Sequence, residues 1–472
     1  MPWVLTRLTW LLFALSLGTF VWSPDWEGVV RGTVLHVDGL THVMGLVTTF
    51  VSGIVHSFSR RYMAGAKHLD RFFGRLFGLT LIVLLLTAAN HLVLFALVWT
   101  AMGWVLADLI GHVRGWPQAR AASRYTRLYF LSGSALLAGA LGLLGVRAGT
   151  WTIDGTLATV GTLSTPVVAV AAILLLLAAM IQSALVPFHR WLLSSMTAPT
   201  PVSAFMHAGL VNAGGVLLAR FAPVVFEVSA VMLVVVGVGG VSAVLGQAWM
   251  LVQTDVKRQL GASTVAQMGF MVLQGGLGFV PAAIAHLLLH GFYKAYLFLS
   301  AGSVVEHTQP EPNKRPTPTV LSGLVTLATA IGGGALFATL TGKSLTALDS
   351  GTVLTVFVIL AVLHATRSLV RRASLSATVR LWAVPLALLP SIGLYAAVYK
   401  GVTALLDTLP MAVTPTAITP LHWGLLAVFV LAYVAIEMGW HRGSTRLYVA
   451  LLNTSQPLPT TLLHNREQYN AH

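Results

Sequence analysis

The chain has 472 residues, of which 56% are hydrophobic and only 9% are charged. A soluble globular protein carries about 25% charged residues, so the composition excludes a protein surrounded by water and indicates a membrane protein. The chain has no cysteine, which excludes disulfides, iron–sulfur clusters and thiolate metal sites. The net charge of +14 is typical of the lysine and arginine excess in cytoplasmic loops of membrane proteins, and does not require nucleic-acid binding.

Apolar stretches of about 20 residues, the length that crosses a bilayer as a helix, recur along the whole chain. The first follows a single basic residue, Arg7, and lacks a small-residue cleavage site, so we interpret it as a retained helix and not as a secretory signal. The fold class is predicted to be an all-α polytopic membrane protein. About fourteen spans are predicted, near residues 4–22, 35–57, 72–89, 91–112, 124–146, 164–186, 202–220, 224–251, 256–276, 280–302, 318–343, 352–370, 379–400 and 419–440.

Basic residues concentrate in every second loop between these spans. The opposite loops hold little besides Arg31, Arg147 and Lys400. Because cytoplasmic loops carry an excess of lysine and arginine, the alternation supports the number of spans and predicts that both termini are cytoplasmic. The basic residues with the cytoplasmic parity include Arg60, Arg61, Lys67, Arg71, Arg75, Arg114, Arg120, Arg124, Arg127, Arg190, Lys257, Arg258, Lys314, Arg315, Arg371 and Arg372.

A few ionisable or polar side chains lie inside the predicted spans, where they are costly and normally mark an ion path. The segment AHLLLHGFYKAYLF places His286, His290 and Lys294 on one helix face. An uncompensated lysine inside a span costs about 2.5–3.5 kcal/mol, so we interpret this stripe as part of a proton pathway. Further candidates are Asp108, Gln182, His207, Lys343, His364 and Arg367.

Several of these candidates also have a purely structural interpretation. Asp108 lies near a helix end and can reach the membrane surface, and His207 can be a core histidine that bonds a backbone carbonyl. His286 and His290 have helical metal-ligand spacing, but no convincing third ligand accompanies them, so no metal site is predicted. Gly342 and Lys343 mark either a broken helix or an interfacial loop.

Two predicted breaks, near Pro187 and Gly342, lie five spans apart. Interrupted helices in corresponding positions of two halves are typical of inverted repeats that enclose an ion site. The predicted organisation is N-terminal helices over 1–71, a first five-helix repeat over 72–221, a second over 222–372, two C-terminal helices over 373–442 and a cytoplasmic tail over 443–472.

Long motifs in the chain resemble a known family. SSMTAPTPVSAFMHAG, LVQTDVKRQLGASTVAQMGFM, AHLLLHGFYKAYLFLSAGSV and, near the N-terminus, LHVDGLTHVMGLV closely resemble the proton-conducting antiporter-like subunits of complex I (NADH dehydrogenase subunit 5-like) and of Mrp-type antiporters. The resemblance implies two inverted five-helix repeats with discontinuous helices. It also implies proton-pathway roles, because Lys343 matches the lysine of the second break, Lys294, His290 and His286 match the central stripe, and His207 matches the histidine after PTPVSA.

The sequence departs from the family at two positions. Thr100 stands where the family has glutamate, and Gln182 stands where the family has the lysine before the first break. In the family these two charges form an ion pair that gates the first half-channel, and losing both is less costly than stranding one. Asp108, about 12 Å further along the helix than Thr100, would serve only a relocated site. We therefore expect the first half-channel to be altered or closed and the second to be intact.

Within the family, the chain looks most similar to the membrane subunits of the bacterial DAB inorganic-carbon transporters (DabB subunits), because it lacks both the charge pair and the long lateral arm of complex I subunits. This resemblance implies a bacterial inner (plasma) membrane protein with a large cytoplasmic zinc-containing DabA-like partner. Inward flow of a cation, H⁺ or Na⁺, would power the hydration of CO2 to bicarbonate in that partner. This chain would be a transporter subunit, not an enzyme, and would hold no cofactor. The amphipathic stretch Leu447–Leu452 is either a docking element or an interfacial helix.

Two other functions remain open: a subunit of complex I or of an Mrp-type antiporter, and a scaffold that does not conduct. The buried ionisable residues argue against a scaffold, which has no use for their cost. In the conducting interpretation Lys294 and Lys343 exchange protons and His290 and His286 connect them through water. Asp108 or Asp255 communicates with the cytoplasmic side, and Gln182 and Thr100 are possible relay positions.

Overall fold

The structure is a computed structural model that describes residues 1–22, 32–302, 320–344, 347–370, 376, 379–406 and 416–461. These residues are almost entirely helical, with three isolated β-bridges and no longer strand pairing. The predicted all-α fold class is thereby confirmed. The predicted loop residues Arg31, Lys314, Arg315, Arg371 and Arg372, and the tail from residue 462 onward, lie outside the described residues.

Thirteen helical segments among the described residues are long and apolar enough to cross a membrane. One of them, Thr200–Arg220, is discontinuous and consists of α9, the π-helical turn η3 and α10. The predicted span near 256–276 corresponds to α13, which has a span's length of 21 residues but carries Lys257 and Arg258 in its first turn. The elements are α1 (Pro2–Trp22), α2 (Gly39–Tyr62), α3 (Leu69–Ala88), α4 (Leu92–Ile110), α5 (Pro117–Ala148), α6 (Ile153–Thr159), α7 (Thr165–Gln182), α8 (Arg190–Ser194), α9 (Thr200–Phe205), η3 (Met206–Leu210), α10 (Ala213–Arg220), α11 (Ala222–Val225), α12 (Ser229–Val252), α13 (Val256–Gly276), α14 (Val280–Ser300), α15 (Val320–Leu340), α16 (Ser350–Val370), α17 (Val384–Leu406), α18 (Pro420–Glu437), α19 (Trp440–Gly443) and α20 (Thr445–Thr454).

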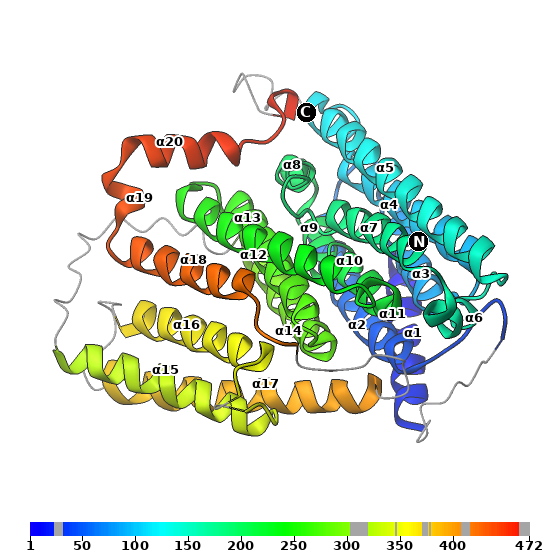
Figure 1. The fold of residues 1–472 in the computed structure, drawn as a ribbon. Coiled ribbons are helices and arrows are strands. Elements are labelled where there is room, and N and C mark those ends of the chain that lie inside the picture. Colours follow the sequence, from blue (N-terminus) through cyan, green and yellow to red (C-terminus); the bar gives the residue numbers. More distant parts are fainter. Residues whose placement is uncertain are drawn as a thin grey trace.

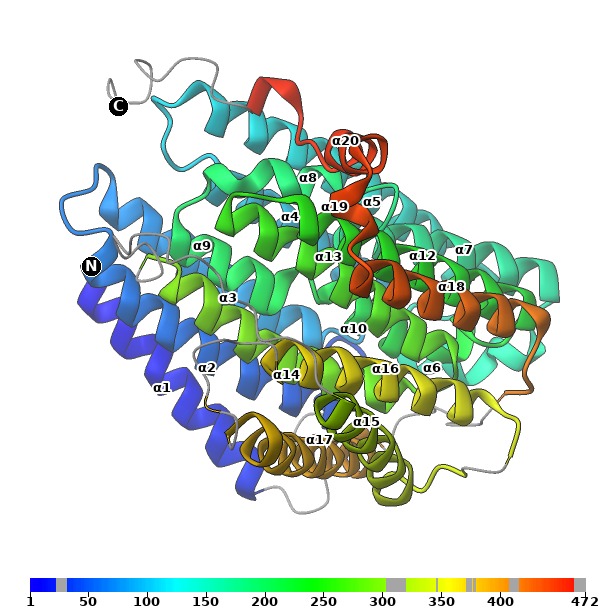
Figure 2. The ribbon, with the colours of Figure 1, turned by 90° about the vertical axis from the view of Figure 1, so that its left-hand side faces the viewer.

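The helices α12, α13 and α14 occupy the middle of the bundle. Figure 1 shows α1–α10 on one side of this group and α15–α18 on the other, and Figure 2 gives the view from the side of α15–α18. The helix α14 packs against α9, η3 and α10 on the first side and against α13 and α17. It therefore lies where the two parts of the bundle meet, and its side chains can contact both.

Glycines allow α12 and α13 to approach backbone to backbone. A Cβ atom built on Gly246 of α12 would lie 2.4 Å from the backbone nitrogen of Ala266, and one on Gly269 of α13 would lie 2.5 Å from that of Ala243. Small residues at helix contacts are typical of membrane bundles, where close van der Waals packing holds helices together.

Gly246→Ala is expected to destabilise the protein by about 1–3 kcal/mol, the usual cost of overpacking. The matched control is Gly237→Ala on the same helix, where nothing lies within 4 Å of the added methyl group; there the change should be neutral or stabilising, since alanine favours helix by about 1 kcal/mol. Unfolding of both variants in the same detergent, followed by circular dichroism, measures the difference. Equal stabilities would contradict the close approach of the two backbones.

The chain leaves the helical conformation at both predicted breaks. The helix α7 ends at Gln182, and the short α8 begins only at Arg190. Near the second break Gly342 has φ +69°, a left-handed conformation that favours glycine. This break falls between α15 and α16, each of 21 residues, which lie side by side in Figures 1 and 2. Of the two alternatives that the sequence leaves open at Lys343, the structure has the loop.

Candidate functional site

The predicted stripe on α14 is buried in the middle of the bundle. The side chain of Lys294 is completely buried, and its Nζ atom donates a hydrogen bond to the carbonyl oxygen of Leu260 at 2.8 Å. None of the described residues forms an ion pair with Lys294. A buried amine is costly when it is charged, and here only a backbone carbonyl contacts it. Such surroundings are typical of a lysine that gains and loses a proton.

His207, from the other side of the bundle, lies beside this lysine. Its Nδ1 atom is 2.9 Å from the hydroxyl of Thr264, which donates to the same Leu260 carbonyl that Lys294 contacts. Its ring stacks on Phe298 with centroids 4.3 Å apart. His207 lies in the π-helical turn η3, and such turns are frequent at functional sites. The network Lys294–Leu260–Thr264–His207 thus joins α14, α13 and η3.

His290 and His286 continue the stripe toward the Val280 end of α14. The two rings lie with centroids 5.9 Å apart, and the Nε2 atom of His290 is buried with no hydrogen-bond partner among the described residues. The Nδ1 atom of His286 is 3.0 Å from Oε1 of Gln274 on α13, whose amide nitrogen donates to the hydroxyl of Tyr395 on α17 at 3.3 Å.

Lys343 lies at this same end of α14, inside a cage of aromatic rings. Its Nζ atom is 4.6 Å from the ring centre of Phe279, 5.2 Å from that of Phe337 and 4.4 Å from that of Tyr399. It also donates to the Tyr399 hydroxyl at 3.4 Å. Cation–π contacts stabilise an ammonium group by about 0.5–2 kcal/mol each, so the cage favours the protonated amine. Among the described residues Asp349 attracts it electrostatically, but no carboxylate lies within ion-pair distance of it.

The structure therefore brings three of the sequence-predicted residues into one column on α14, with His207 beside one end and Lys343 near the other. The column runs along α14 from Lys294 through His290 and His286, and Lys343 lies beyond its far end. Sequence reasoning missed Gln274 and Tyr395, which form a hydrogen-bonded chain with His286, and Tyr399, which contacts Lys343. Tyrosines one helical turn apart on α17 are a weak signal by themselves, and a single glutamine in an apolar helix is a weaker one.

Asp108 lies away from this column in an ion triad of the first helices. Its two carboxylate oxygens are 2.8 Å from Nη2 of Arg75 on α3 and 2.5 Å from Nη2 of Arg127 on α5. The three side chains are partly exposed and tie α3, α4 and α5 together. These contacts favour the structural interpretation of Asp108 over a place in the proton pathway.

The three possible relay positions are hydrogen-bonded to backbone atoms. The hydroxyl of Thr100 donates to the Ala96 carbonyl at 2.8 Å, and the amide of Gln182 donates to the Leu210 carbonyl at 3.0 Å. Asp255 caps α13 by accepting from the backbone N–H of Arg258 at 2.9 Å. No hydrogen bond between Thr100 and Gln182 is present in the described part of the chain, so these residues do not rebuild the family's charge pair.

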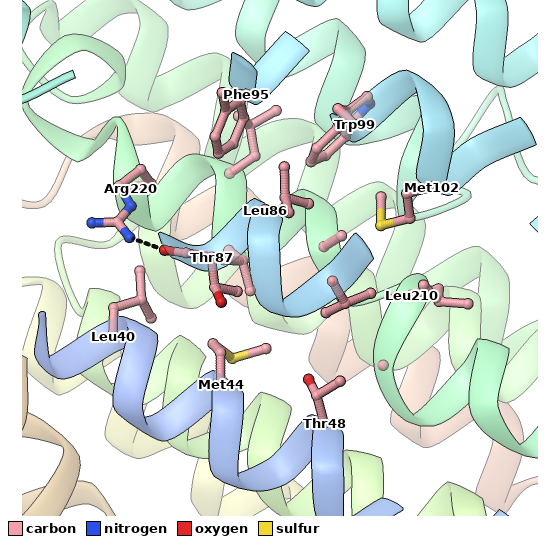
Figure 3. Close-up of a pocket in the computed structure, with 15 residues that line it drawn as sticks. Leu40, Met44, Thr48, Leu86, Thr87, Phe95, Trp99, Met102, Leu210 and Arg220 are labelled. Atoms are coloured by element: carbon pink, nitrogen blue, oxygen red, sulfur yellow. Dashed lines mark hydrogen bonds between the residues drawn. The ribbon is translucent and has the colours of Figure 1, made fainter. Parts of the chain in front are cut away.

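The first helices enclose a cavity whose lining includes Trp99, the neighbour of Thr100, and Leu210, whose carbonyl accepts from Gln182. Figure 3 shows it between α2, α3, α4, η3 and α10, lined mainly by apolar side chains, with Arg220 bonded to Thr87 at one side. Arg220 is the only ionisable residue of the lining, and it is paired with Asp38. The lining offers no group that can exchange a proton at this place. Its labelled residues are Leu40, Met44, Thr48, Leu86, Thr87, Phe95, Trp99, Met102, Leu210 and Arg220.

The described residues contain no group of three or more histidine, aspartate or glutamate side chains that could hold a metal ion. His286 and His290 lie one turn apart on α14, but the hydrogen-bond partner of His286 is an amide, Gln274. This arrangement does not suit a zinc site, which needs a third protein ligand.

Comparison with known proteins identifies the family. The model of the family described as "NADH:quinone oxidoreductase/Mrp antiporter, TM" matches residues 89–328, and that of "NADH-Ubiquinone oxidoreductase (complex I), chain 5 N-terminus" matches residues 32–73. The first match covers half of the chain, including His207, His286, His290 and Lys294. The chain belongs to this family of antiporter-like transmembrane subunits, as its motifs predicted.

Individual relatives come from different branches of the family. The chain is 38% identical over 296 residues to the "Probable inorganic carbon transporter subunit DabB1" of Halothiobacillus neapolitanus, a match that covers 61% of this chain and 53% of that relative. It is 36% identical over 307 residues to the "NADH-quinone oxidoreductase subunit L" of Mycobacterium tuberculosis, covering 64% of this chain and 48% of that relative. The chain thus spans about half the length of the curated relatives it matches.

A solved structure has the same fold. The Mrp complex from Dietzia sp. DQ12-45-1b matches with a TM-score of 0.59 and 25% sequence identity over 100% of this chain and 51% of that chain. This match supports the antiporter-like arrangement of helices.

Proposed function

We propose that the chain is the ion-conducting membrane subunit of an energy-coupled inorganic-carbon accumulation complex. The observation that carries the conducting role is the buried Lys294, which has no ion-pair partner among the described residues and is linked through Leu260 and Thr264 to His207. A group of this kind is costly to bury and is useful only if its protonation changes. The similarity to DabB1 supports inorganic carbon as the cargo of the complex.

In the proposed mechanism a proton moves along the α14 column. Lys294 exchanges protons with the His207 network at one end, His290 and His286 carry them along the helix with water, and Lys343 exchanges them at the other end. The lost charge pair at Thr100 and Gln182 leaves the first half closed, so one path serves the chain. The proposed site of CO2 hydration is a large cytoplasmic zinc-containing partner, on the side where both termini would lie.

A proton-pumping subunit of complex I, or a subunit of an Mrp-type antiporter, is the second candidate. The match to subunit L of Mycobacterium tuberculosis and the Mrp complex structure support it. The same lysines and histidines would act in either complex, so the partners distinguish the two functions. A neighbouring gene for a large zinc protein favours carbon accumulation, and neighbouring quinone-reductase or antiporter genes favour the alternative.

Uptake of labelled inorganic carbon tests the proposal. Cells lacking carbonic anhydrase would express this chain with the adjacent gene, or either one alone, with and without an uncoupler. We expect accumulation that requires both genes and is abolished by the uncoupler. Absence of accumulation, together with co-purification of the chain with quinone-reductase or antiporter subunits, would replace the carbon function with the second candidate.

A further inference from the structure

A chain of directed hydrogen bonds connects α14 to α17 through α13. The hydroxyl of Tyr395 donates to the carbonyl oxygen of Ala282 at 3.4 Å and accepts from the amide nitrogen of Gln274 at 3.3 Å. The amide oxygen of Gln274 then faces the Nδ1 atom of His286 at 3.0 Å. The side chain of Gln274 is 2% exposed, so solvent does not compete for these bonds.

The direction of each bond follows from its neighbour. A backbone carbonyl can only accept, so the Tyr395 hydroxyl must donate to Ala282 and accept from Gln274. Gln274 donates to Tyr395 through its NH2 group, so its amide oxygen is the atom that faces His286. An amide oxygen can only accept a hydrogen bond. The Nδ1 atom of His286 therefore carries a hydrogen, and in the neutral ring Nε2 is the atom that can accept a proton.

We propose that Gln274 and Tyr395 are positioning residues that fix the tautomer of His286, so that its Nε2 atom exchanges the proton. His286 takes the proton at Nε2, becomes an imidazolium while Nδ1 keeps its own hydrogen on Gln274, and releases the proton from Nε2 again. Tyr399, one turn from Tyr395 on α17, contacts Lys343, so the same helix also holds the far end of the column. This inference rests on the proposed proton conduction but concerns residues that neither the family motifs nor the sequence indicated.

Nitrogen spectra of the histidines test the tautomer directly. The full chain, labelled with 15N-histidine and reconstituted in lipid bilayers, would be measured by solid-state NMR, and the His286→Gln variant would assign the signal. We expect His286 in the Nδ1–H form in the wild type and in Gln274→Glu, which keeps an acceptor oxygen. Gln274→Leu should shift the signal toward the Nε2–H form. An Nε2–H ring in the wild type, or an unchanged signal in Gln274→Leu, would overturn the proposal.

The same variants in the carbon-uptake assay test the consequence for conduction. Gln274→Leu should lower uptake by about tenfold or more, as expected when a proton-transfer group loses its orientation, and Gln274→Glu should restore most of it. Tyr395→Phe should give an intermediate loss, whereas Tyr293→Phe, an exposed tyrosine on α14, should behave as the wild type. Wild-type uptake by an assembled Gln274→Leu variant would overturn the positioning role. Absence of uptake in the wild type would overturn the proposed function, and the NMR result would still decide the tautomer.

Discussion

Lys294→Ala is expected to abolish coupled transport while the complex still assembles. The amine is completely buried on α14 and meets a backbone carbonyl in place of a carboxylate, so its removal breaks the column but strands no opposite charge. Removing an uncompensated buried cation recovers the cost of burying a lysine in a span, about 2.5–3.5 kcal/mol, and this offsets the cavity that the shorter side chain leaves, so the variant should still fold. Uptake of labelled inorganic carbon, with the amount of assembled complex measured in the same membranes, gives both quantities.

Lys343→Ala is expected to have the same effect on transport for a different reason. Its ammonium group lies in the cage of Phe279, Phe337 and Tyr399. Without the lysine, this mainly aromatic space holds no amine that can exchange a proton. Lys400→Ala is the matched control, because that lysine is on the exposed side of α17. Wild-type uptake in an assembled Lys343→Ala variant would remove this residue from the pathway, and loss of uptake in Lys400→Ala would show that the assay responds to charge alone.

The α14 stripe could be predicted from the sequence because it depends only on the helical period. Residues four apart lie on one face, so His286, His290 and Lys294 align in any regular helix over this segment. The span positions follow from apolar length in the same way. These parts of the site are local, and local patterns are visible in the sequence.

The partners of the stripe could not be predicted from the residues alone because they come from packing between distant segments. Gly291, next to His290, allows α14 to lie against η3: a Cβ atom there would be 2.6 Å from the carbonyl oxygen of Ala208. That contact places His207 beside Lys294. In the same way, Tyr395 and Tyr399 come from α17, which follows both predicted repeats in the chain. No periodic pattern in the sequence indicates a hydrogen bond between Gln274 and a tyrosine 121 residues further along the chain.

Arg220→Met is expected to destabilise the protein by about 3–5 kcal/mol, the cost of breaking a buried ion pair by removing one partner. The guanidinium of Arg220, at the end of α10, pairs with the carboxylate of Asp38, and both side chains are less than a tenth exposed. It also donates to the Thr87 carbonyl at 2.6 Å. The pair therefore holds together the ends of α2, α3 and α10 at one side of the cavity in Figure 3.

The double variant Asp38→Asn/Arg220→Met separates the ion pair from the packing of its side chains. Because the cost in Arg220→Met comes mainly from the stranded carboxylate, the double variant should recover a large part of the lost stability, as measured by unfolding in detergent. Stabilities that simply add in the double variant would show that the two charges do not act together.

The pH dependence of this stabilisation gives a further check with a definite sign. Burial raises the pKa of Asp38, which precedes the span α2, but the Arg220 charge and the hydrogen bonds from Thr41 outweigh this and hold the pKa below its usual value of 3.8. A carboxylate with a lowered folded-state pKa contributes stability that is fully present above the unfolded value and is lost as the pH falls through the folded value. The stability difference between wild type and double variant should therefore be constant above that range and shrink only below pH 3.8. A difference that already shrinks near neutral pH would mean that Asp38 is not held as a carboxylate by Arg220, and the ends of α2 and α10 would then be joined by packing alone.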